Sequence, residues 1–417
     1  MDDDDGSKVS RGPLRSFKSV PFRFFWIASL ASIVSFFMAT ISRGWLVLDI
    51  TDSAFMVTSI NAIGLLPTLG LSLYGGVIAD RMDRKSVLIA SDIVSFLTIS
   101  AIAILLLINR IELWHIFGLT LVHGSSFALA MPSRASLVSN LVHADYMSSA
   151  VALYTTIFSA GQMVGPGIAG YLINSYGMVT PFVISACILL PSVILLMKVS
   201  PDTPKLDQND IKSSLGRSIL EGLSYVRDHS VLFGLILMGV AATVFALPYQ
   251  TLLPVFARDV LGVGAAGLGW LGAMGGAGSI TGSITIASLT SLKQIKLLML
   301  SGSIGLGFFI ILFAISDNYF FSRILLFCVG FCFQIFMTSN FTFVQLIAPE
   351  YIRGRVLSIR MIAFGLSPFG MLILGVGAES LGPRIATAIT GAASVLLLSS
   401  IIILVSGLTG VDRYAKS

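Results

Sequence analysis

The feature that most constrains this chain is a series of apolar runs, each long enough to cross a lipid bilayer. Six lie at about 22–48, 55–79, 86–108, 112–134, 145–174 and 178–198, and six more at about 231–256, 266–289, 295–315, 319–343, 352–380 and 384–407. A helix needs about 20 apolar residues to span the ~30 Å hydrocarbon core. The sequence therefore predicts an all-α polytopic membrane protein with twelve transmembrane helices.

The composition agrees with this fold class and excludes others. Apolar residues make up 55% of the chain and charged residues 11%, and the mean hydropathy is +0.91, far from the composition of soluble domains. No basic patch with interleaved aromatic residues indicates a nucleic-acid partner. The three cysteines lie inside apolar runs, which argues against a disulfide framework. Cys328 and Cys332 are four residues apart and offer a soft metal two ligands, but buried packing is the more common role, so we expect no metal and no cofactor.

The distribution of Lys and Arg predicts the topology. If alternate loops are assigned to opposite sides, all but five of the 26 cations fall on one side, which the positive-inside rule makes cytoplasmic. The exceptions are Arg43, Arg110, Arg258, Arg323 and Arg384. Both termini are then cytoplasmic. We expect a cytoplasmic segment at 1–21, a six-helix bundle at 22–199, a linker at 200–230 with an amphipathic helix, a second bundle at 231–407 and a tail at 408–417.

The two halves repeat. A shift of 205 residues places Gly165 on Gly370, Gly170 on Gly375 and Gly177 on Gly382 without a gap. This repeat predicts two pseudo-symmetric six-helix bundles related by an axis along the membrane normal, with a substrate site between them near the midplane.

A charged loop between the second and third runs carries the sharpest motif. It has the spacing G-x-x-x-D-R-x-x-R-K, formed by Gly76, Asp80, Arg81, Arg84 and Lys85. This spacing resembles the loop signature of the major facilitator superfamily; the alternative is a charged loop with no special role. Asp92 lies about two helical turns beyond Lys85, and Arg134 ends the fourth run on the same side. We expect Asp92 to pair with these cations and to latch the cytoplasmic face, with simple neutralisation of a buried aspartate as the alternative.

A second motif, formed by Gly161, Gly165, Pro166 and Gly170, lies in the fifth run. It resembles the antiporter motif of exporters in the superfamily, with one more residue before the final glycine, although helix packing alone also explains it. Further stretches resemble the enterobactin-exporter and macrolide-efflux branch, at 44–51, 221–225, 253–259 and 345–356. The resemblance implies a secondary exporter of the bacterial cytoplasmic membrane that is usually driven by proton antiport.

The chain departs from that branch midway along the first run, where Ser35 and Phe36 replace a common Gly-Asp pair. The remaining candidates for proton coupling are His123 and Asp92. Arg43 and His123 are costly at membrane depth and lie on runs that line the cavity in this superfamily. A snorkelling arginine and a hydrogen-bonded core histidine are the alternatives. The expected substrate cavity comprises Arg43, His123, Ser125, Tyr249, Gln250, Gln334 and Asn340.

These features predict a monomeric secondary exporter that moves a small amphipathic organic molecule, such as a drug, a macrolide or a siderophore-like compound, by alternating access. Protons are the candidate counter-ion, and the lipid bilayer is the surrounding partner. A metal-ion exporter and a lipid flippase of the same fold are the alternatives. A membrane-embedded enzyme is disfavoured because the sequence contains neither His-x-x-x-x-Asp nor Gly-x-Ser-x-Gly.

Overall fold

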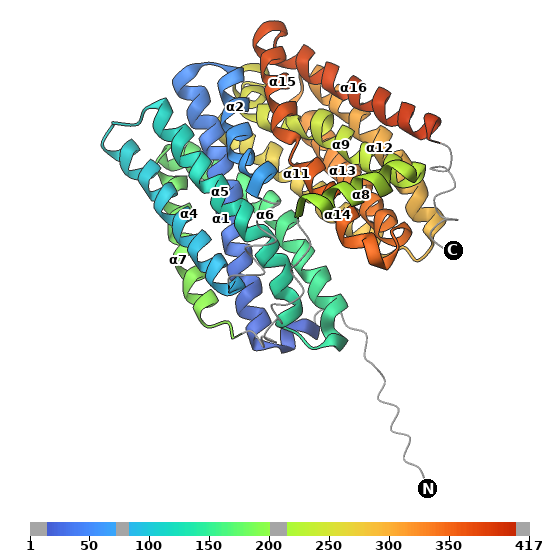
Figure 1. Cartoon of the computed structure of the whole chain (residues 1–417). Coiled ribbons are helices and arrows are strands. Elements are labelled where there is room, and N and C mark those ends of the chain that lie inside the picture. Colours follow the sequence, from blue (N-terminus) through green and yellow to red (C-terminus); the bar gives the residue numbers. More distant parts are fainter. Residues whose placement is uncertain (1–14, 72–82, 201–214, 406–417) are drawn as a thin grey trace.

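The computed structural model describes residues 15–71, 83–200 and 215–405, and these residues form helices without a strand (Figure 1). Gly76, Asp80 and Arg81 of the loop motif lie outside the described residues. The helices of the first half are α1 (Val20–Thr51), α2 (Ala54–Leu65), α4 (Arg84–Leu107), α5 (Leu113–Leu137), α6 (Met147–Tyr176) and α7 (Thr180–Met197). Short 3₁₀ turns occur at Arg15–Lys18, Val138–Asn140 and Ala144–Tyr146.

The second half begins with α8 (Leu215–Asp228), which agrees with the amphipathic helix expected in the linker. It continues with α9 (Ser230–Ala241), η5 (Ala242–Ala246), η6 (Leu247–Leu252), α10 (Leu253–Val255) and η7 (Phe256–Val260), then α11 (Gly264–Ala287), α12 (Leu292–Ile315), α13 (Tyr319–Ile347), α14 (Glu350–Phe364), α15 (Ser367–Leu381) and α16 (Pro383–Leu404). Pro248 and Pro254 lack the backbone N–H of a regular helix, which explains the 3₁₀ and π turns after α9.

Helical residues occupy all twelve predicted runs, so the all-α polytopic class is confirmed. Nine of the described helices are long and apolar enough to cross a membrane. The glycine-rich α6 and α11 are less hydropathic and are not among the nine. The expectation of one helix over 352–380 is wrong: the chain turns at 365–366 between α14 and α15. Pro368, the second residue of α15, has no backbone N–H to donate to the carbonyl oxygen of residue 364, so it interrupts the helical hydrogen bonds at this turn.

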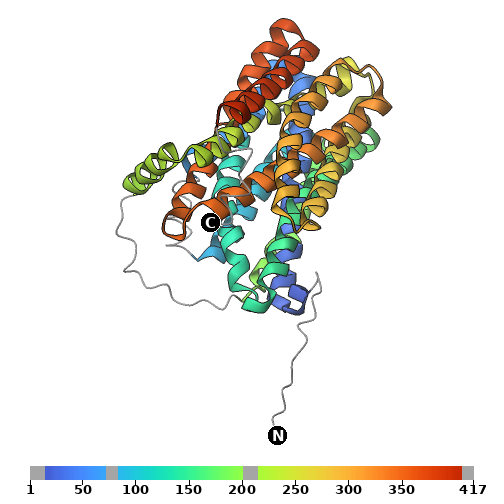
Figure 2. The ribbon, with the colours of Figure 1, turned by 90° about the vertical axis from the view of Figure 1, so that its right-hand side faces the viewer.

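The two halves meet along two helix pairs, α6 with α11 and α2 with α15. Within the first half, α1 packs on α6 and α7, and α4 packs on α5 and α7; within the second, α13 packs on α11 and α12, and α12 on α16. We call the upper end in Figure 1, where α1 ends, the Asp52 end, and the lower end, where α5 ends, the Arg134 end. Figure 2 shows α8 projecting to one side, where it contacts α14 and α9.

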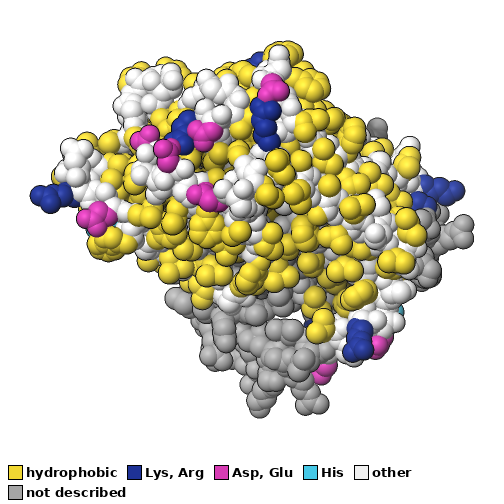
Figure 3. Space-filling view, turned by 90° about the horizontal axis from the view of Figure 1, so that it is seen from above, with side chains coloured by type: hydrophobic (Ala, Val, Ile, Leu, Met, Phe, Trp, Pro, Cys, Tyr) yellow, Lys and Arg dark blue, Asp and Glu magenta, His cyan; other side chains and the backbone are white. Residues whose placement is uncertain are grey.

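Hydrophobic side chains cover much of the face seen from above (Figure 3), and large ones are exposed on many helices. Leu97, Ile284, Leu396 and Ile403 are between 58% and 79% exposed. In water so large an apolar surface would drive aggregation, whereas a bilayer covers it at no cost. The buried side chains, including Phe182, Phe256 and Phe343, fill the spaces between helices.

Candidate functional site: a buried polar cluster in the first half

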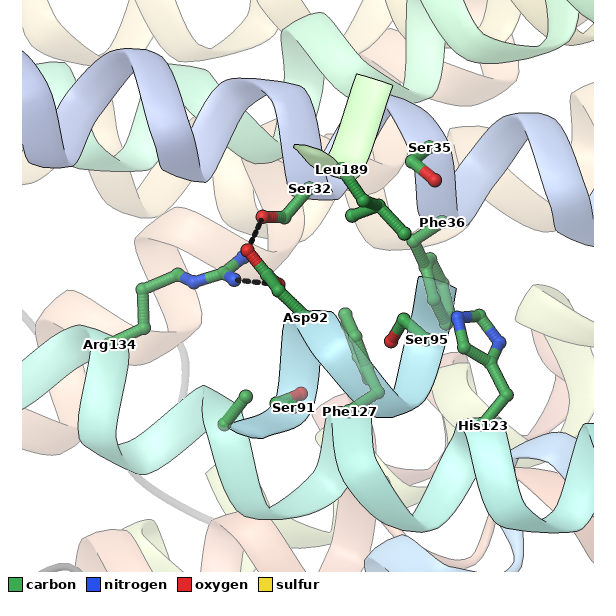
Figure 4. A pocket seen from close by; sticks show the side chains of 11 residues that line it. Ser32, Ser35, Phe36, Ser91, Asp92, Ser95, His123, Phe127, Arg134 and Leu189 are labelled. Atoms are coloured by element: carbon green, nitrogen blue, oxygen red, sulfur yellow. Dashed lines mark hydrogen bonds and ion pairs between the residues drawn. The ribbon is translucent and has the colours of Figure 1, made fainter. Parts of the chain in front are cut away.

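Asp92 lies on α4, about 12 Å from the start of that helix. The hydroxyls of Ser32 on α1 and Ser192 on α7 each donate a hydrogen bond of 2.7 Å to its Oδ2. Nη2 of Arg134, on α5, lies 3.8 Å from its Oδ1 (Figure 4). All four side chains are buried. Four helices therefore converge on one carboxylate, and two hydroxyls and a guanidinium offset the cost of burying it.

A cavity of about 10 Å³ adjoins this carboxylate. Besides Asp92 and Arg134 it is lined by Ser32, Ser35, Phe36, Ser91, Ser95, His123, Phe127, Ala130 and Leu189. Nε of Arg134 is buried and makes no hydrogen bond to the described residues. The volume is close to that of one water molecule, and the polar groups around it provide several hydrogen-bonding partners.

Serine hydroxyls connect this cavity to His123. Ser91 donates to the carbonyl oxygen of Ser126 at 2.9 Å, and the hydroxyls of Ser95 and Ser126 lie 3.3 Å apart. Ser126 in turn donates to the carbonyl oxygen of His123 at 2.8 Å. Polar groups therefore extend along the α4–α5 contact from Asp92 toward His123.

His123 and Arg43 form a buried pair between α5 and α1. Nη1 of Arg43 lies 2.9 Å from Nδ1 of His123, and Nη2 donates to Oγ1 of Thr40 at 3.2 Å. Because a guanidinium can only donate, Nδ1 accepts the bond and the ring proton lies on Nε2. A second ring proton on Nδ1 would break this bond and place two cations together. The ring of Phe36, at the position of the missing acid, lies 5.6 Å from that of His123.

The predicted cavity residues separate into two groups. Arg43 and His123 are only 4% and 2% exposed and contact each other. Ser125 bonds to the carbonyl of Leu121, and Gln250 and Gln334 are partly exposed. Tyr249 and Asn340 are buried in the second half, far from that pair in sequence. Neither side chain is exposed to an open cavity in this conformation. Tyr249 packs edge-on against Phe313, and Asn340 donates to the carbonyl oxygen of Leu235.

The described part of the loop motif begins α4. Arg84 donates to the carbonyl oxygen of Ser136 at 3.3 Å, and Nζ of Lys85 donates to that of Met197 at 2.7 Å. The expected proximity of Asp92 to Arg134 is observed. The expected contact of Asp92 with Lys85 is not formed in this conformation, in which Lys85 binds the carbonyl oxygen at the end of α7.

The glycine motif of α6 lies where three helices cross. A Cβ on Gly165 would lie 2.7 Å from Cβ of Phe37 on α1, and one on Gly161 would lie 2.5 Å from Cγ2 of Ile33. On the other side of α6, a Cβ on Gly170 would lie 2.7 Å from Cα of Gly269 on α11. The motif therefore permits backbone contact both within the first half and between the halves.

Polar contacts also join the halves at the Asp52 end, and the sequence interpretation did not anticipate them. Arg258 of η7 binds Asp52 at 2.6 Å and the carbonyl oxygen of Leu48 at 3.1 Å. Oε2 of Glu379 on α15 accepts bonds of 3.1 Å from Ser53 Oγ and Phe55 N. The only sequence signal was that these charges lie near the predicted outer ends of their helices.

Two packed helical halves, with a polar cluster inside one of them, are the arrangement of a polytopic membrane protein of the major facilitator fold. Solved structures share this fold: a nucleoside transporter, NupG, has a TM-score of 0.69 at 15% identity and covers 93% of this chain and 99% of its own. A POT family transporter has a TM-score of 0.74 at 11% identity, covering 93% and 96%. The chain belongs to the family described as transmembrane secretion effector, whose model matches residues 11–417.

Characterised relatives are similar over most of their length. The multidrug efflux pump Tap of Mycolicibacterium fortuitum is 25% identical over 89% of this chain and 92% of its own. The staphyloferrin A transporter of Staphylococcus aureus is 25% identical over 86% and 90%. The enterobactin exporter EntS of Escherichia coli is 25% identical over 80% and 79%. The chain is accordingly a multi-pass membrane transporter of this superfamily.

Proposed function

We propose that this protein is a secondary exporter that moves a small amphipathic organic molecule out across the bacterial cytoplasmic membrane, in exchange for protons. The efflux pump and the enterobactin exporter among the relatives support the direction, and together with the staphyloferrin A transporter they support the cargo class. The Arg134 end and both termini are then cytoplasmic. The protein acts as a monomer, and its two halves, 22–199 and 231–407, are joined by the linker at 200–230.

The buried cluster around Asp92 is the observation that supports proton exchange. A carboxylate bound by two hydroxyls and a guanidinium can take up a proton and release its partners. His123 is the second proton acceptor, because protonation of Nδ1 displaces Arg43. The phenyl ring of Phe36 occupies the position of the usual acid, so coupling in this chain does not use a carboxylate on α1.

Alternating access requires the contacts at each end of the molecule to form and break in turn. The contacts of Asp52 and Glu379 hold the outer end closed in this conformation. Arg84 and Lys85, with the rest of the loop motif, hold the cytoplasmic end closed in the other conformation, and the Asp92–Arg134 pair, already formed within the first half, supports the start of α4 beside them. The glycines of α6 provide the surface along which the halves move.

The proposal is tested by measuring export of a drug, a macrolide and a siderophore from inverted membrane vesicles, with and without a protonophore. We expect export by the wild type to fall when the proton gradient collapses. Asp92→Asn and His123→Gln should lose this dependence. The matched controls are Asp145→Asn and His143→Gln, which remove a pair of the same residue types from the exposed surface, where they lie 3.1 Å apart.

Each part of the proposal has its own contrary result. Wild-type export that ignores the gradient excludes proton exchange. Mutants that remain as gradient-dependent as the controls exclude Asp92 and His123 as the proton site. Export of none of the three compounds contradicts the cargo class.

A further inference from the structure

Arg360 lies deep in the second half, although its sequence position places it with the cations of a cytoplasmic loop. It follows the start of α14 at Glu350 by ten residues, which is about 15 Å along the helix. Its Nη2 donates to the carbonyl oxygen of Met337 at 3.2 Å, and Met337 lies an equal ten residues before the end of α13. Its guanidinium carbon lies 4.7 Å from the centre of the Phe341 ring. The charge is therefore held between α13 and α14, away from the ends at which these two helices join.

This guanidinium has no carboxylate partner in the described parts of the chain. Arg134, Arg258, Arg355 and Arg384 each lie within 4.0 Å of an aspartate or glutamate, whereas Arg360 does not. An arginine stays protonated, and an uncompensated charge at membrane depth is costly. Arg360 is also partly exposed, so a negatively charged group can approach it.

We propose that Arg360 binds an acidic group of the transported molecule, so that the cargo is an organic anion. This inference rests on the proposed export function and specifies its substrate class. One N–H of the guanidinium is committed to Met337, which leaves its other donors for a carboxylate. The Phe341 ring and the Met337 side chain provide an adjoining apolar surface for the rest of an amphipathic molecule.

The first half has no free buried carboxylate, among the described residues, that could bind a cationic cargo. Arg43 likewise has no carboxylate within 4.0 Å among the described residues, and it is committed to His123 and Thr40. Asp92, the buried acid of that half, is already bonded to two serines and approached by Arg134. Arg43 in the first half and Arg360 in the second therefore both lack a carboxylate partner among the described residues, and an anion is the complementary ligand.

The test uses the purified full-length protein in phosphatidylcholine vesicles, so that no anionic lipid competes for Arg360. Two dyes of opposite charge are the probes: carboxyfluorescein, an organic acid, and ethidium, an organic cation. We expect Arg360→Gln to slow carboxyfluorescein transport by about tenfold, the loss of one charge-assisted contact. Ethidium transport should change by less than about twofold. Arg360→Lys should restore part of the anion transport, and Arg355→Gln, on the same helix, is the matched control.

Thermal unfolding with each dye separates this inference from the transport function. We expect carboxyfluorescein to raise the unfolding temperature of the wild type and of Arg355→Gln, but not that of Arg360→Gln. Excess inorganic phosphate should not reproduce the shift; if it does, the site binds a free anion rather than the cargo. Equal losses for both dyes in Arg360→Gln, or no stabilisation of the wild type by carboxyfluorescein, overturn the inference. Binding without transport of either dye leaves the anion site standing and refutes export.

Discussion

The buried aspartate shows how single hydroxyl groups make a charge tolerable inside an apolar bundle. Ser32 and Ser192 reach Asp92 Oδ2 from two helices that are far apart in sequence. Neither serine differs from its neighbours in the sequence, because serines are frequent in these helices. The candidates Asp92 and His123 were identifiable from the cost of their charges, whereas their partners depended on how α1, α4, α5 and α7 pack.

At this scale we predict that Ser192→Ala destabilises the protein by about 1–3 kcal/mol, because it leaves a charged acceptor with one donor fewer. Thermal unfolding in detergent measures the effect. Ser185→Ala is the control on the same helix, since the Ser185 hydroxyl is buried and has no hydrogen-bond partner within the described residues. A change of about 0.5 kcal/mol or less is expected there. Equal effects of the two substitutions would remove Ser192 from the support of Asp92.

Among the elements, α6 and α11 form the larger of the two helix contacts between the halves, and this contact depends on the absence of side chains. Gly170 faces Gly269, and Gly272 and Gly269 both lie against Pro166. The sequence motif correctly indicated close packing. It did not indicate that its glycines serve two different partner helices, because that depends on the rotation of α6 between them.

We predict that Gly170→Ala lowers export much more than Gly167→Ala. The added Cβ at position 170 meets backbone atoms of α11 that cannot move aside, and overpacking of this kind costs about 1–3 kcal/mol. At position 167 the nearest atom is Cβ of Ala273 at 3.7 Å, an ordinary contact. Export rates at equal amounts of folded protein in the membrane compare the two variants. Equal rates would show that the contact between α6 and α11 tolerates a methyl group.

The hydropathy of the sequence predicts some features of the helices and misses others. Hydropathy locates the twelve apolar runs because the bilayer sets a minimum length for each. It does not reveal the break between α14 and α15, since apolar residues continue in the sequence on both sides of the turn at 365–366. It also misplaces Arg360, because a charge near the end of an apolar run can belong either to the loop or to the helix.

At the scale of the whole molecule, the two halves are closed against each other at the Asp52 end by few polar contacts. Asp52 has a left-handed backbone conformation, with φ of 53°, at the end of α1, and it binds Arg258 of the second half. Because asparagine tolerates this conformation, Asp52→Asn removes the charge without straining the turn.

We predict that Asp52→Asn and Arg258→Gln shift the population toward a conformation that is open at the Asp52 end. Spin labels on the outer ends of α2 and α15 report the change as a longer distance. Asp317→Asn is the control, because the Asp317–Arg384 pair is at the same end but lies within the second half. Arg384 lowers the pKa of Asp317, so this aspartate stays ionised at neutral pH. If the distance is unchanged in both Asp52→Asn and Arg258→Gln, the contacts of Arg258 do not hold this end closed.

The polar cluster of Figure 4 also bears on how a duplicated chain diverges. All four buried charged or histidine side chains among the described residues, Arg43, Asp92, His123 and Arg134, belong to the first copy. In the second copy the buried polar side chains are Ser, Thr and Asn. Both copies are built from helices, whereas buried charges occur, among the described residues, in the first copy alone. The first copy must keep its internal charges balanced, and the described buried polar side chains of the second copy carry no charge to balance.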